Sequence, residues 1–554
     1  MPRPPHWLNR FIALVLAQTL GSLAATSVVT GLDRAAVFLV AVPLITMLLC
    51  TMAGFRAKWG FPVVAIATVT TFAGIHLLRR VIHANWFAGP VLPANMELAG
   101  YGALAILTMA CAASAWVVFS SRGALRKARW IAFGVIAALL VGSAVFIRHS
   151  VNEGSPSSLL KTVVRLEQQG AADPGARQEL SVMLASCGRE ADAEAVSRPM
   201  AVGVGRFARP DTHSRPVDIS RFHARPWREV LTEVAARERL VIVMEAHDEP
   251  KHREWLEQAL SVFRIAGFRD YAAEGLSESG QSLKQRGYPV SSTGPYVCDP
   301  QFGNVLRAAI GLGYELHAYE SYGTNFGQRE HDQAANLARL FSANPNLKLV
   351  VHAGYGHVLK KSRGTGEKSM AAYLWEMTGI EPYCIWQMWH SPEENEARQL
   401  AQLLDPGGEP KMLVPAPSGL SDPQLNFPPG AVDALVIHPP SVGGPSLRVH
   451  SFPSARRRVT AVWNGSEWPV LVGAFKKGES ADAIALDQVM LRKGERGFVL
   501  WIPGDDFELR LFGTRGRLNP ASADGSPALT IAGTDPLQQE AGDRKSEERG
   551  GEAH

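Results

Sequence analysis

The sequence predicts an α/β soluble domain with a mainly parallel sheet, preceded by an all-α membrane domain of about five spans and followed by a small β appendage. Three observations lead to this fold class. Long apolar runs fill the first 150 residues, short apolar runs alternate with helical stretches between 226 and 445, and the helical period stops after about 445. A chain of 554 residues has room for several domains of the usual ~100–200 residues.

The charge of the chain is divided unevenly. The first 150 residues hold 12 of the 56 Lys and Arg and two of the 52 Asp and Glu, a net charge of +10, which leaves −6 for 151–554. The overall charge of +4 therefore reflects the first part and gives no indication of nucleic-acid binding. Five Cys in 554 residues exclude a small fold built on disulfides.

Five apolar runs have the length of membrane spans, since a helix needs about 20 residues to cross the hydrocarbon core. They lie at 11–32, 35–55, 61–78, 96–120 and 130–147. We therefore predict a membrane domain over 1–149 and the lipid bilayer as a partner. A signal peptide is the alternative for the first run, because Arg3 and Arg10 precede it and 23–25 resembles a cleavage site.

Basic residues in the loops predict the orientation of these spans. The first, third and fifth segments outside the spans carry eight Lys and Arg, and the other three carry four. The positive-inside rule places the richer set in the cytoplasm and the chain after Arg148 in the periplasm, which predicts a protein of a bacterial inner membrane. The interiors of the spans hold His76 but no carboxylate, since Glu97 lies at the very start of its run, and this favours an anchor over a transporter.

The remaining chain divides into four further segments. A helical spacer and linker covers 150–225, the α/β domain 226–445, the β appendage 446–520 and a disordered tail 521–554. Strands are expected at 240–244, 271–273, 315–319, 347–351 and 384–388, with additional ones at 411–415 and 433–438. Helices are expected between them, at 251–266, 301–312, 329–342, 368–377 and 393–404. This alternation is typical of crossover units and a parallel sheet.

Polar side chains follow the ends of four predicted strands. The first strand leads into Glu245 and His247, the second into Glu274, the third into Glu320 and the fourth into His357. The carboxyl ends of parallel strands meet at one edge of a sheet, where ligands bind in such folds. We therefore expect a shared site at this edge.

The same segments resemble the erythromycin esterase, ChaN and Tiki superfamily over about 226–400. Met244–His252 is similar to the Gly-Glu-x-His opening of the superfamily, with Met244 in place of the usual Gly, and 272–274 is similar to its second strand and terminal Glu. The helix 329–336 resembles the Arg-Asp-x-x-Met-Ala-x-Asn helix of the esterases. The fourth segment, 350–358, resembles the late strand that ends in His.

The resemblance implies a hydrolase that cleaves an ester, lactone or peptide bond, with a small molecule or peptide as substrate. It implies that His247 is the general base, that Glu245 and Glu274 orient it, and that His357 stabilises an oxyanion or protonates the leaving group. Supporting or substrate-binding roles are expected for further residues of these segments. They are His252, Glu320, Arg329, Glu330 and His352.

Two alternatives stay open at this point. The Tiki branch consists of metal-dependent proteases, and His247, Glu274 and His357 are the candidate ligands of a divalent transition metal. The ChaN branch binds haem, which makes a binding protein without catalysis the other reading. The motifs do not decide between these branches, so the cofactor is open.

Overall fold

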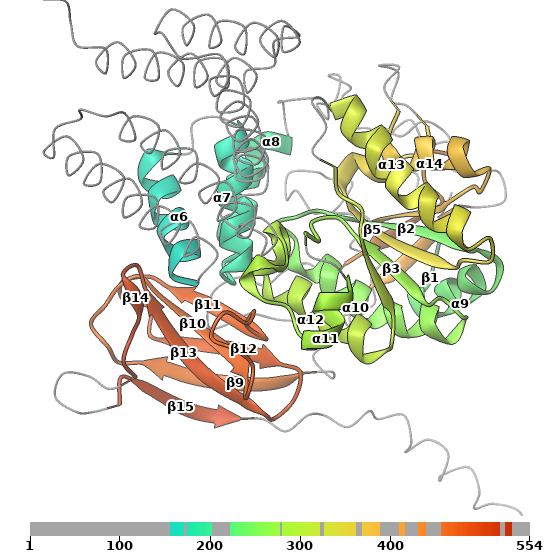
Figure 1. Ribbon diagram of the computed structural model, residues 1–554. Helices are drawn as coiled ribbons and strands as arrows, with labels where there is room; N and C mark the ends of the chain where they lie inside the picture. The colour runs from blue at the N-terminus through green and yellow to red at the C-terminus, as the bar shows by residue number, and fades with distance from the viewer. Residues whose placement is uncertain are drawn as a thin grey trace, which may run out of the picture. The chain divides into compact units, whose positions relative to one another are not determined.

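The computed structural model describes residues 156–170, 174–201, 222–277, 280–321, 326–361, 368–387, 409–415, 430–438, 456–520 and 527–534. The chain divides into two compact units, Met1–Glu153 and Gly154–His554. The first unit lies outside the described residues, so the elements below all belong to the second (Figure 1).

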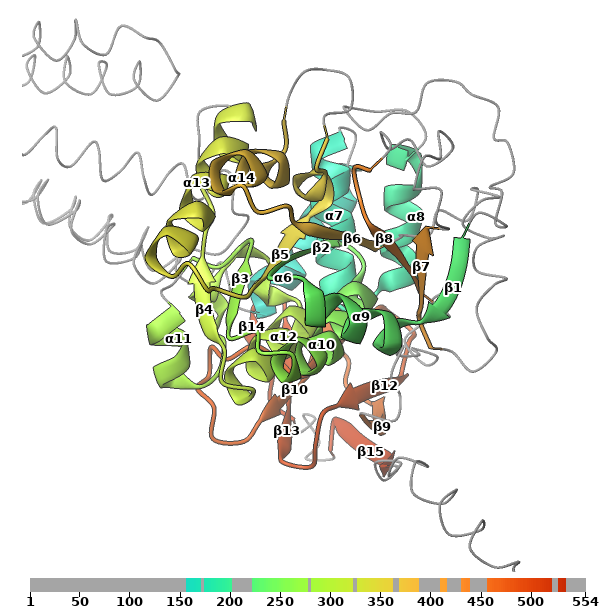
Figure 2. The same ribbon diagram turned by 90° about the vertical axis from the view of Figure 1, so that its right-hand side faces the viewer.

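An eight-stranded sheet forms the centre of the α/β domain, in the order β1-β7-β8-β6-β2-β5-β3-β4 (Figure 2). The strands are β1 (Phe222–Pro226), β2 (Leu240–Glu245), β3 (Asp270–Ala273), β4 (Glu315–Ala318), β5 (Leu349–Gly354), β6 (Tyr383–Gln387), β7 (Lys411–Pro415) and β8 (Ala434–Ile437). The six strands from β8 to β4 pair in parallel, and β7 and β1 pair antiparallel. β2 and β5 are buried along their whole length, because helices cover both faces of the sheet.

Two layers of helices cover the sheet. The first consists of α9 (Trp227–Arg237), α10 (Pro250–Ile265), α11 (Gly280–Arg286) and α12 (Pro300–Gly311), and the second of α13 (Phe326–Ala343) and α14 (Met370–Thr378). Successive side chains of a strand point to opposite faces. Val243 accordingly packs in the first layer and Met244 in the second. Glu245 comes next and turns toward the α10 side, where it meets Arg253.

In the described residues before and after this domain, three helices precede it and a β sandwich follows it. The helices are α6 (Pro156–Gln169), α7 (Pro174–Ser186) and α8 (Glu190–Ala201). The sandwich consists of β9 (Arg457–Trp463), β10 (Val470–Lys476), β11 (Asp487–Leu491), β12 (Gly497–Ile502), β13 (Phe507–Gly513), β14 (Gly516–Arg517) and β15 (Leu529–Thr534). One sheet has the order β11-β10-β13-β14 and the other β12-β9-β15, and their inner faces share an apolar core.

The predicted fold class is wrong in two respects. No helix in the described part of the chain is long and apolar enough to cross a membrane, and the all-α membrane domain is not part of the described fold. The five runs that predicted it, within 1–149, lie outside the described residues. The eight-stranded sheet is mixed, because β7 and β1 pair antiparallel beside the six parallel strands, and the two sheets of the sandwich are antiparallel. The physical reason is that an apolar run indicates a buried strand but carries no information on its direction.

The predicted disordered tail contains a strand, and two other predictions fall outside the described residues. β15 lies within 521–554, where we expected disorder; its residues pair with β9 across an irregularity at Ile531 and Gly533. The predicted helix at 393–404 lies outside the described residues. The bilayer partner and the periplasmic location depended on the predicted spans and stay predictions.

Candidate active site at the carboxyl ends of the strands

Four neighbouring strands bring polar side chains to one edge of the sheet. β2 ends in Glu245, Glu274 directly follows β3, Glu320 lies two residues beyond β4, and β5 ends in Gly354, three residues before His357. The order β2-β5-β3-β4 makes these strands adjacent. Residues 29 to 112 positions apart in the sequence therefore meet at this edge.

Glu245 is the centre of a buried polar network. Its carboxylate is 2 % exposed and accepts two hydrogen bonds from Arg253, from Nε and Nη2, both of 2.6 Å. His352 Nε2 lies 2.7 Å from Oε2, while its Nδ1 lies 2.9 Å from the hydroxyl of Tyr271. Burial opposes ionisation of Glu245, but Arg253 and His352 hold its pKa well below the usual range. Glu245 is therefore a carboxylate that is fixed in place.

Arg253 is anchored on its other side by Asp299. The guanidinium is fully buried, donates through Nη1 to Asp299 and lies 5.2 Å from the ring centre of Phe302. Asp299 caps α12 by accepting a hydrogen bond of 2.7 Å from the amide of Gln301. One arginine thus joins the start of α12 to the end of β2.

His247 lies against this carboxylate. Its Nδ1 is 2.8 Å from Glu245 Oε1, and its ring is 4.0 Å from that of Tyr296, nearly parallel at 15°. The ring of Tyr355 meets it edge-on at 4.9 Å. Because an ionised carboxylate only accepts hydrogen bonds, Nδ1 carries the proton and Nε2 is the basic atom. The two tyrosines fix the plane of the ring.

Tyr355 itself has an unusual backbone conformation. Its φ is 32°, and it is the single non-glycine residue with positive φ in the described part of the chain. Such conformations cost about 1–3 kcal/mol and gather at functional sites. Here the conformation places the aromatic ring against His247 and the hydroxyl 3.3 Å from Asp248.

Gly354 leaves the space that His247 occupies. A Cβ at this position would lie 2.4 Å from Cε1 and 2.5 Å from Nε2 of His247, and 3.0 Å from Oε2 of Glu274. The basic atom of His247 and the carboxylate of Glu274 therefore both face this glycine. Its amide donates a hydrogen bond of 2.5 Å to that same Oε2.

Gly354→Ala is expected to destabilise the protein by about 1–3 kcal/mol, because the new methyl group overlaps a buried ring. Urea denaturation followed by circular dichroism measures the change. Gly311→Ala, where a Cβ meets nothing within 4 Å, is the matched control. Equal midpoints for the two variants would contradict the close packing of His247 on Gly354.

Glu274 and Glu320 share one arginine. Arg329 Nη2 donates to Glu274 Oε1 and to Glu320 Oε2, both at 2.7 Å, and Arg329 Nε donates to Glu320 Oε1 at 2.9 Å. Gln333 Nε2, at 2.8 Å, and the amide of Ser321, at 2.9 Å, also donate to Glu320 Oε1. We call Glu245, His247, Glu274, Glu320, Arg329, Glu330 and His357 the cluster. The side chain of Arg329 is 28 % exposed, so it forms the accessible side of the cluster.

His357 is held by two carboxylates. Its Nδ1 lies 2.7 Å from Glu330 Oε1, and its Nε2 lies 3.5 Å from Glu274 Oε1. Glu330 is fully buried, and its other oxygen accepts a hydrogen bond of 2.6 Å from the amide of Met370, the first residue of α14. A helix N-terminus favours negative charge, which stabilises this carboxylate.

The charges of this cluster are mutually dependent. Burial alone would lower the pKa of His357, but Glu274 and Glu330 raise it to about 10. Burial likewise opposes ionisation of Glu274, yet His357 and Arg329 hold its pKa well below the usual range. At neutral pH His357 is an imidazolium, 3.1 Å from the guanidinium of Arg329. Two positive charges therefore lie side by side at Glu274, whose Oε2 faces the same glycine as His247.

Two residues for which we expected supporting or substrate-binding roles, His252 and His352, are buried away from the accessible side of the cluster. His252 is fully buried on α10, accepts a hydrogen bond of 3.0 Å from the amide of Ala246, and lies 4.9 Å from His438. It shapes the turn after β2 and is not a member of the cluster. His352 is also fully buried, so its role is to hold the carboxylate of Glu245 and not to bind a substrate.

Sequence reasoning missed Arg253, Asp299, Tyr296 and Tyr355. A local signal existed for Asp299, because Asp before Pro300 is typical of a helix start. No signal indicated its ion pair with Arg253, 46 residues earlier, or the stacking of Tyr296 on His247. These contacts arise because α10 and α12 pack on the same face of the sheet.

The donor set does not fit a resident metal ion. Among the described residues no group of three or more His, Cys, Asp or Glu is arranged to hold one. Of the candidate ligands, His357 has Glu330 at Nδ1 (2.7 Å) and Glu274 at Nε2 (3.5 Å), so carboxylates face both of its ring nitrogens. Glu274 is already bonded by Arg329 and by the amide of Gly354. We therefore derive no step through a metal.

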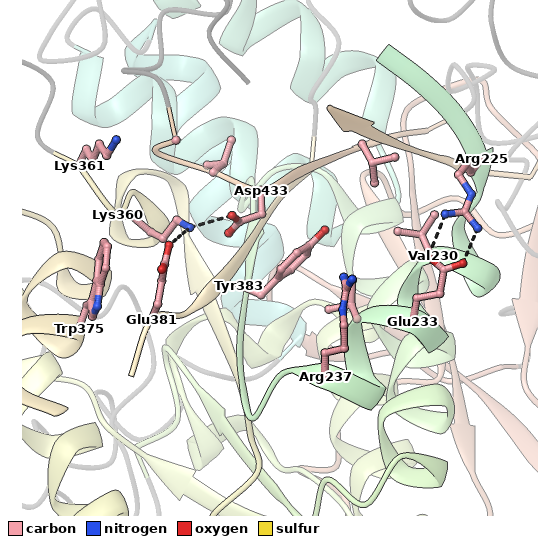
Figure 3. A pocket seen from close by; sticks show the side chains of 14 residues that line it. Arg225, Val230, Glu233, Arg237, Lys360, Lys361, Trp375, Glu381, Tyr383 and Asp433 are labelled. Atoms are coloured by element: carbon pink, nitrogen blue, oxygen red, sulfur yellow. Dashed lines mark hydrogen bonds and ion pairs between the residues drawn. The ribbon is translucent and has the colours of Figure 1, made fainter. Parts of the chain in front are cut away.

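A cavity of about 580 Å³ lies elsewhere in this domain (Figure 3). It is bounded by Tyr383 and Asp433, at the amino ends of β6 and β8, whereas the cluster lies at carboxyl ends. Two ion pairs line it, Arg225 with Glu233 and Lys360 with Asp433. We do not place the chemistry in this cavity, because it contains none of the clustered residues.

Comparisons with known proteins show no family for this chain. No protein-family model matches it, and no curated protein matches it. Among solved structures, the type III effector HopBA1 is similar with 14 % identity and a TM-score of 0.23, over 30 % of this chain and 86 % of that one. RRSP, a MARTX toxin effector domain from Vibrio vulnificus, is similar with 10 % identity and a TM-score of 0.24, over 70 % of this chain and 91 % of that one. Scores this low carry no argument about fold or function.

Proposed function

We propose that this protein is a hydrolase that activates water with His247 to cleave an ester, lactone or peptide bond. The observation that carries the proposal is the pair of His247 and Glu245. Nδ1 of the imidazole lies 2.8 Å from a carboxylate that Arg253 keeps ionised, so Nε2 is the atom left to accept a proton. A carboxylate that holds the tautomer and favours the imidazolium is the usual partner of a histidine base.

The reaction follows from these positions. A water molecule gives one proton to Nε2 of His247 while its oxygen attacks the scissile carbonyl carbon, which produces a tetrahedral oxyanion. Glu245 stabilises the imidazolium that forms. When the intermediate collapses, the bond to the leaving group breaks and His247 returns its proton to that group.

The positive charges at Glu274 suit the oxyanion, because Glu274 Oε2 and His247 Nε2 face the same glycine, Gly354. Arg329 and the imidazolium of His357 lie 3.1 Å apart, and fixed charges of this kind stabilise a developing negative charge most strongly when they are prearranged. The raised pKa of His357 means that it keeps its proton at neutral pH. We therefore give His357 the stabilising role and leave proton transfer to His247.

The resemblance to the erythromycin esterase, ChaN and Tiki superfamily supports the same reaction class. The replacement of its usual Gly by Met244 is compatible with it, because the Met244 side chain is fully buried against the second helix layer. It points away from Glu245 and His247.

The proposal is tested with purified full-length protein and three probes, p-nitrophenyl acetate, a macrocyclic lactone and casein. His247→Ala is expected to lower the rate on whichever probe is cleaved by at least about 10²-fold, the usual contribution of a general base. His317→Gln is the control, because His317 pairs with Asp270 outside the cluster. Unchanged hydrolysis in His247→Ala and in His357→Gln would refute the proposal.

Haem binding without catalysis, the other prediction from the sequence, is distinguished in the same preparation. A Soret band on haem addition, together with no turnover of any probe, would favour it. Turnover that depends on His247 would favour the hydrolase.

A further inference from the structure

One short segment supplies two of the groups that hold His247. In the 3₁₀ helix η4 (Pro295–Cys298), Tyr296 stacks on the imidazole at 4.0 Å. Asp299, directly after η4, anchors Arg253, which in turn binds Glu245. The position of this segment therefore determines both the position of the ring that stacks on His247 and the position of Glu245, the partner of its Nδ1.

The β sandwich contacts this segment through Gln488 on β11. The side chain of Gln488 is buried, and its Nε2 donates to the carbonyl of Cys298 at 3.2 Å and to the carbonyl of Ser186 at 2.7 Å. The amide of Met490 adds a hydrogen bond of 2.8 Å to the carbonyl of Cys187. One strand of the sandwich thus binds the end of η4 and the end of α7 together.

The same strand and the loop before it also contact α12, which Asp299 caps. Asn304 Nδ2 donates to the carbonyl of Leu486 at 2.8 Å, and Arg307 Nη2 donates to the carbonyl of Ile484 at 2.6 Å. At Gly303 a Cβ would lie 2.8 Å from the Ile484 side chain, so the glycine is what allows this close approach. The sandwich therefore touches the segment on both sides of Asp299.

We propose that the β sandwich positions the imidazole of His247, and that Gln488 is the positioning residue. It acts through η4 on Tyr296 and through Asp299 on Arg253. The contacts are a property of the fold, and only the catalytic role of His247 rests on the proposed function. The appendage is then a structural component of the active site rather than an independent binding module.

The expected result is a change in the reactivity of His247 that needs no substrate to observe. Diethyl pyrocarbonate acylates the neutral imidazole, and peptide mass spectrometry assigns the rate to each histidine of the full-length protein. Gln488→Met keeps the volume of the side chain but removes the hydrogen-bond donor. The ring of Tyr296 is then held less firmly against the imidazole of His247. The His247 rate is expected to rise about fivefold, the factor that corresponds to one hydrogen bond.

Two controls separate positioning from general loosening. His317, paired with Asp270, reports from the same sample and is expected to keep its rate. Asn464→Leu removes a side-chain amide elsewhere in the sandwich, where Asn464 bonds Thr530 at 3.3 Å, and is expected to leave His247 unchanged. If Gln488→Met does not fold, Asn304→Leu removes the neighbouring contact to Leu486 instead.

A double variant tests the route. Tyr296→Leu removes the stacked ring directly, and adding Gln488→Met to it is expected to change the His247 rate by less than the product of the single effects. An unchanged His247 rate in Gln488→Met, a parallel rise at His317, or full additivity would each overturn the inference. Absence of hydrolysis would refute the proposed function but leave these rates interpretable.

Discussion

Replacing Arg253 with methionine is expected to lower the free energy of unfolding by about 3–5 kcal/mol, the usual cost of removing one partner from a buried ion pair. The carboxylates of Glu245 and Asp299 are 2 % and 1 % exposed, and Arg253 is the cation that binds both. Without it, two buried negative charges lose their direct counter-charge. The same variant is expected to release Glu245 from its fixed position next to His247.

Urea denaturation at pH 7 checks this expectation. Arg225→Met is the matched control, because Arg225 pairs with Glu233 at the surface, where solvent screens the two charges and the pair contributes little to stability. Adding Asp299→Asn to Arg253→Met removes one of the two buried negative charges that lost their counter-charge, and it is expected to recover part of the free energy of unfolding. Similar losses for Arg253→Met and Arg225→Met would contradict the buried network.

The second large effect is a loss of stability at alkaline pH that depends on His357. Burial disfavours its charge, but Glu274 and Glu330 raise its pKa to about 10 in the folded protein, against an ordinary value of 6.5. A raised pKa means that the folded state binds the proton more tightly than the unfolded state does. The stabilisation is therefore complete below pH 6.5 and is lost as the pH rises through about 10.

The measurement compares the native protein with His357→Gln across this range. The difference between their free energies of unfolding is expected to shrink by up to about 1.4 kcal/mol per pH unit between the two pKa values. Other alkaline titrations, such as those of lysines, occur in both proteins and cancel in the difference. A difference that is independent of pH would show that His357 is not held as an imidazolium by these carboxylates.

The members of the candidate site were accessible to sequence reasoning, because polar residues at strand ends are a local pattern. Glu245, His247, Glu274 and His357 each follow an apolar run of strand length, and the structure brings all four to one edge. His252 shows the limit of this reasoning. It lies five residues beyond His247 on the next helix, but its side chain turns into the domain and binds the amide of Ala246.

The sequence by itself determined strands β2 to β8, the polar residues that follow four of them and that these residues would meet, since this depends on local periodicity and on the parallel crossover rule. It did not indicate β1, at the end of the predicted linker, or β15, within the predicted disordered tail. The tertiary structure alone decided the direction of β7 and β1, the burial of Arg253 between Glu245 and Asp299, and the contact of Gln488 with η4. The reason is physical. Hydrophobic patterns record how a residue is buried, whereas ion pairs and stacked rings between distant segments depend on which helices share a face of the sheet.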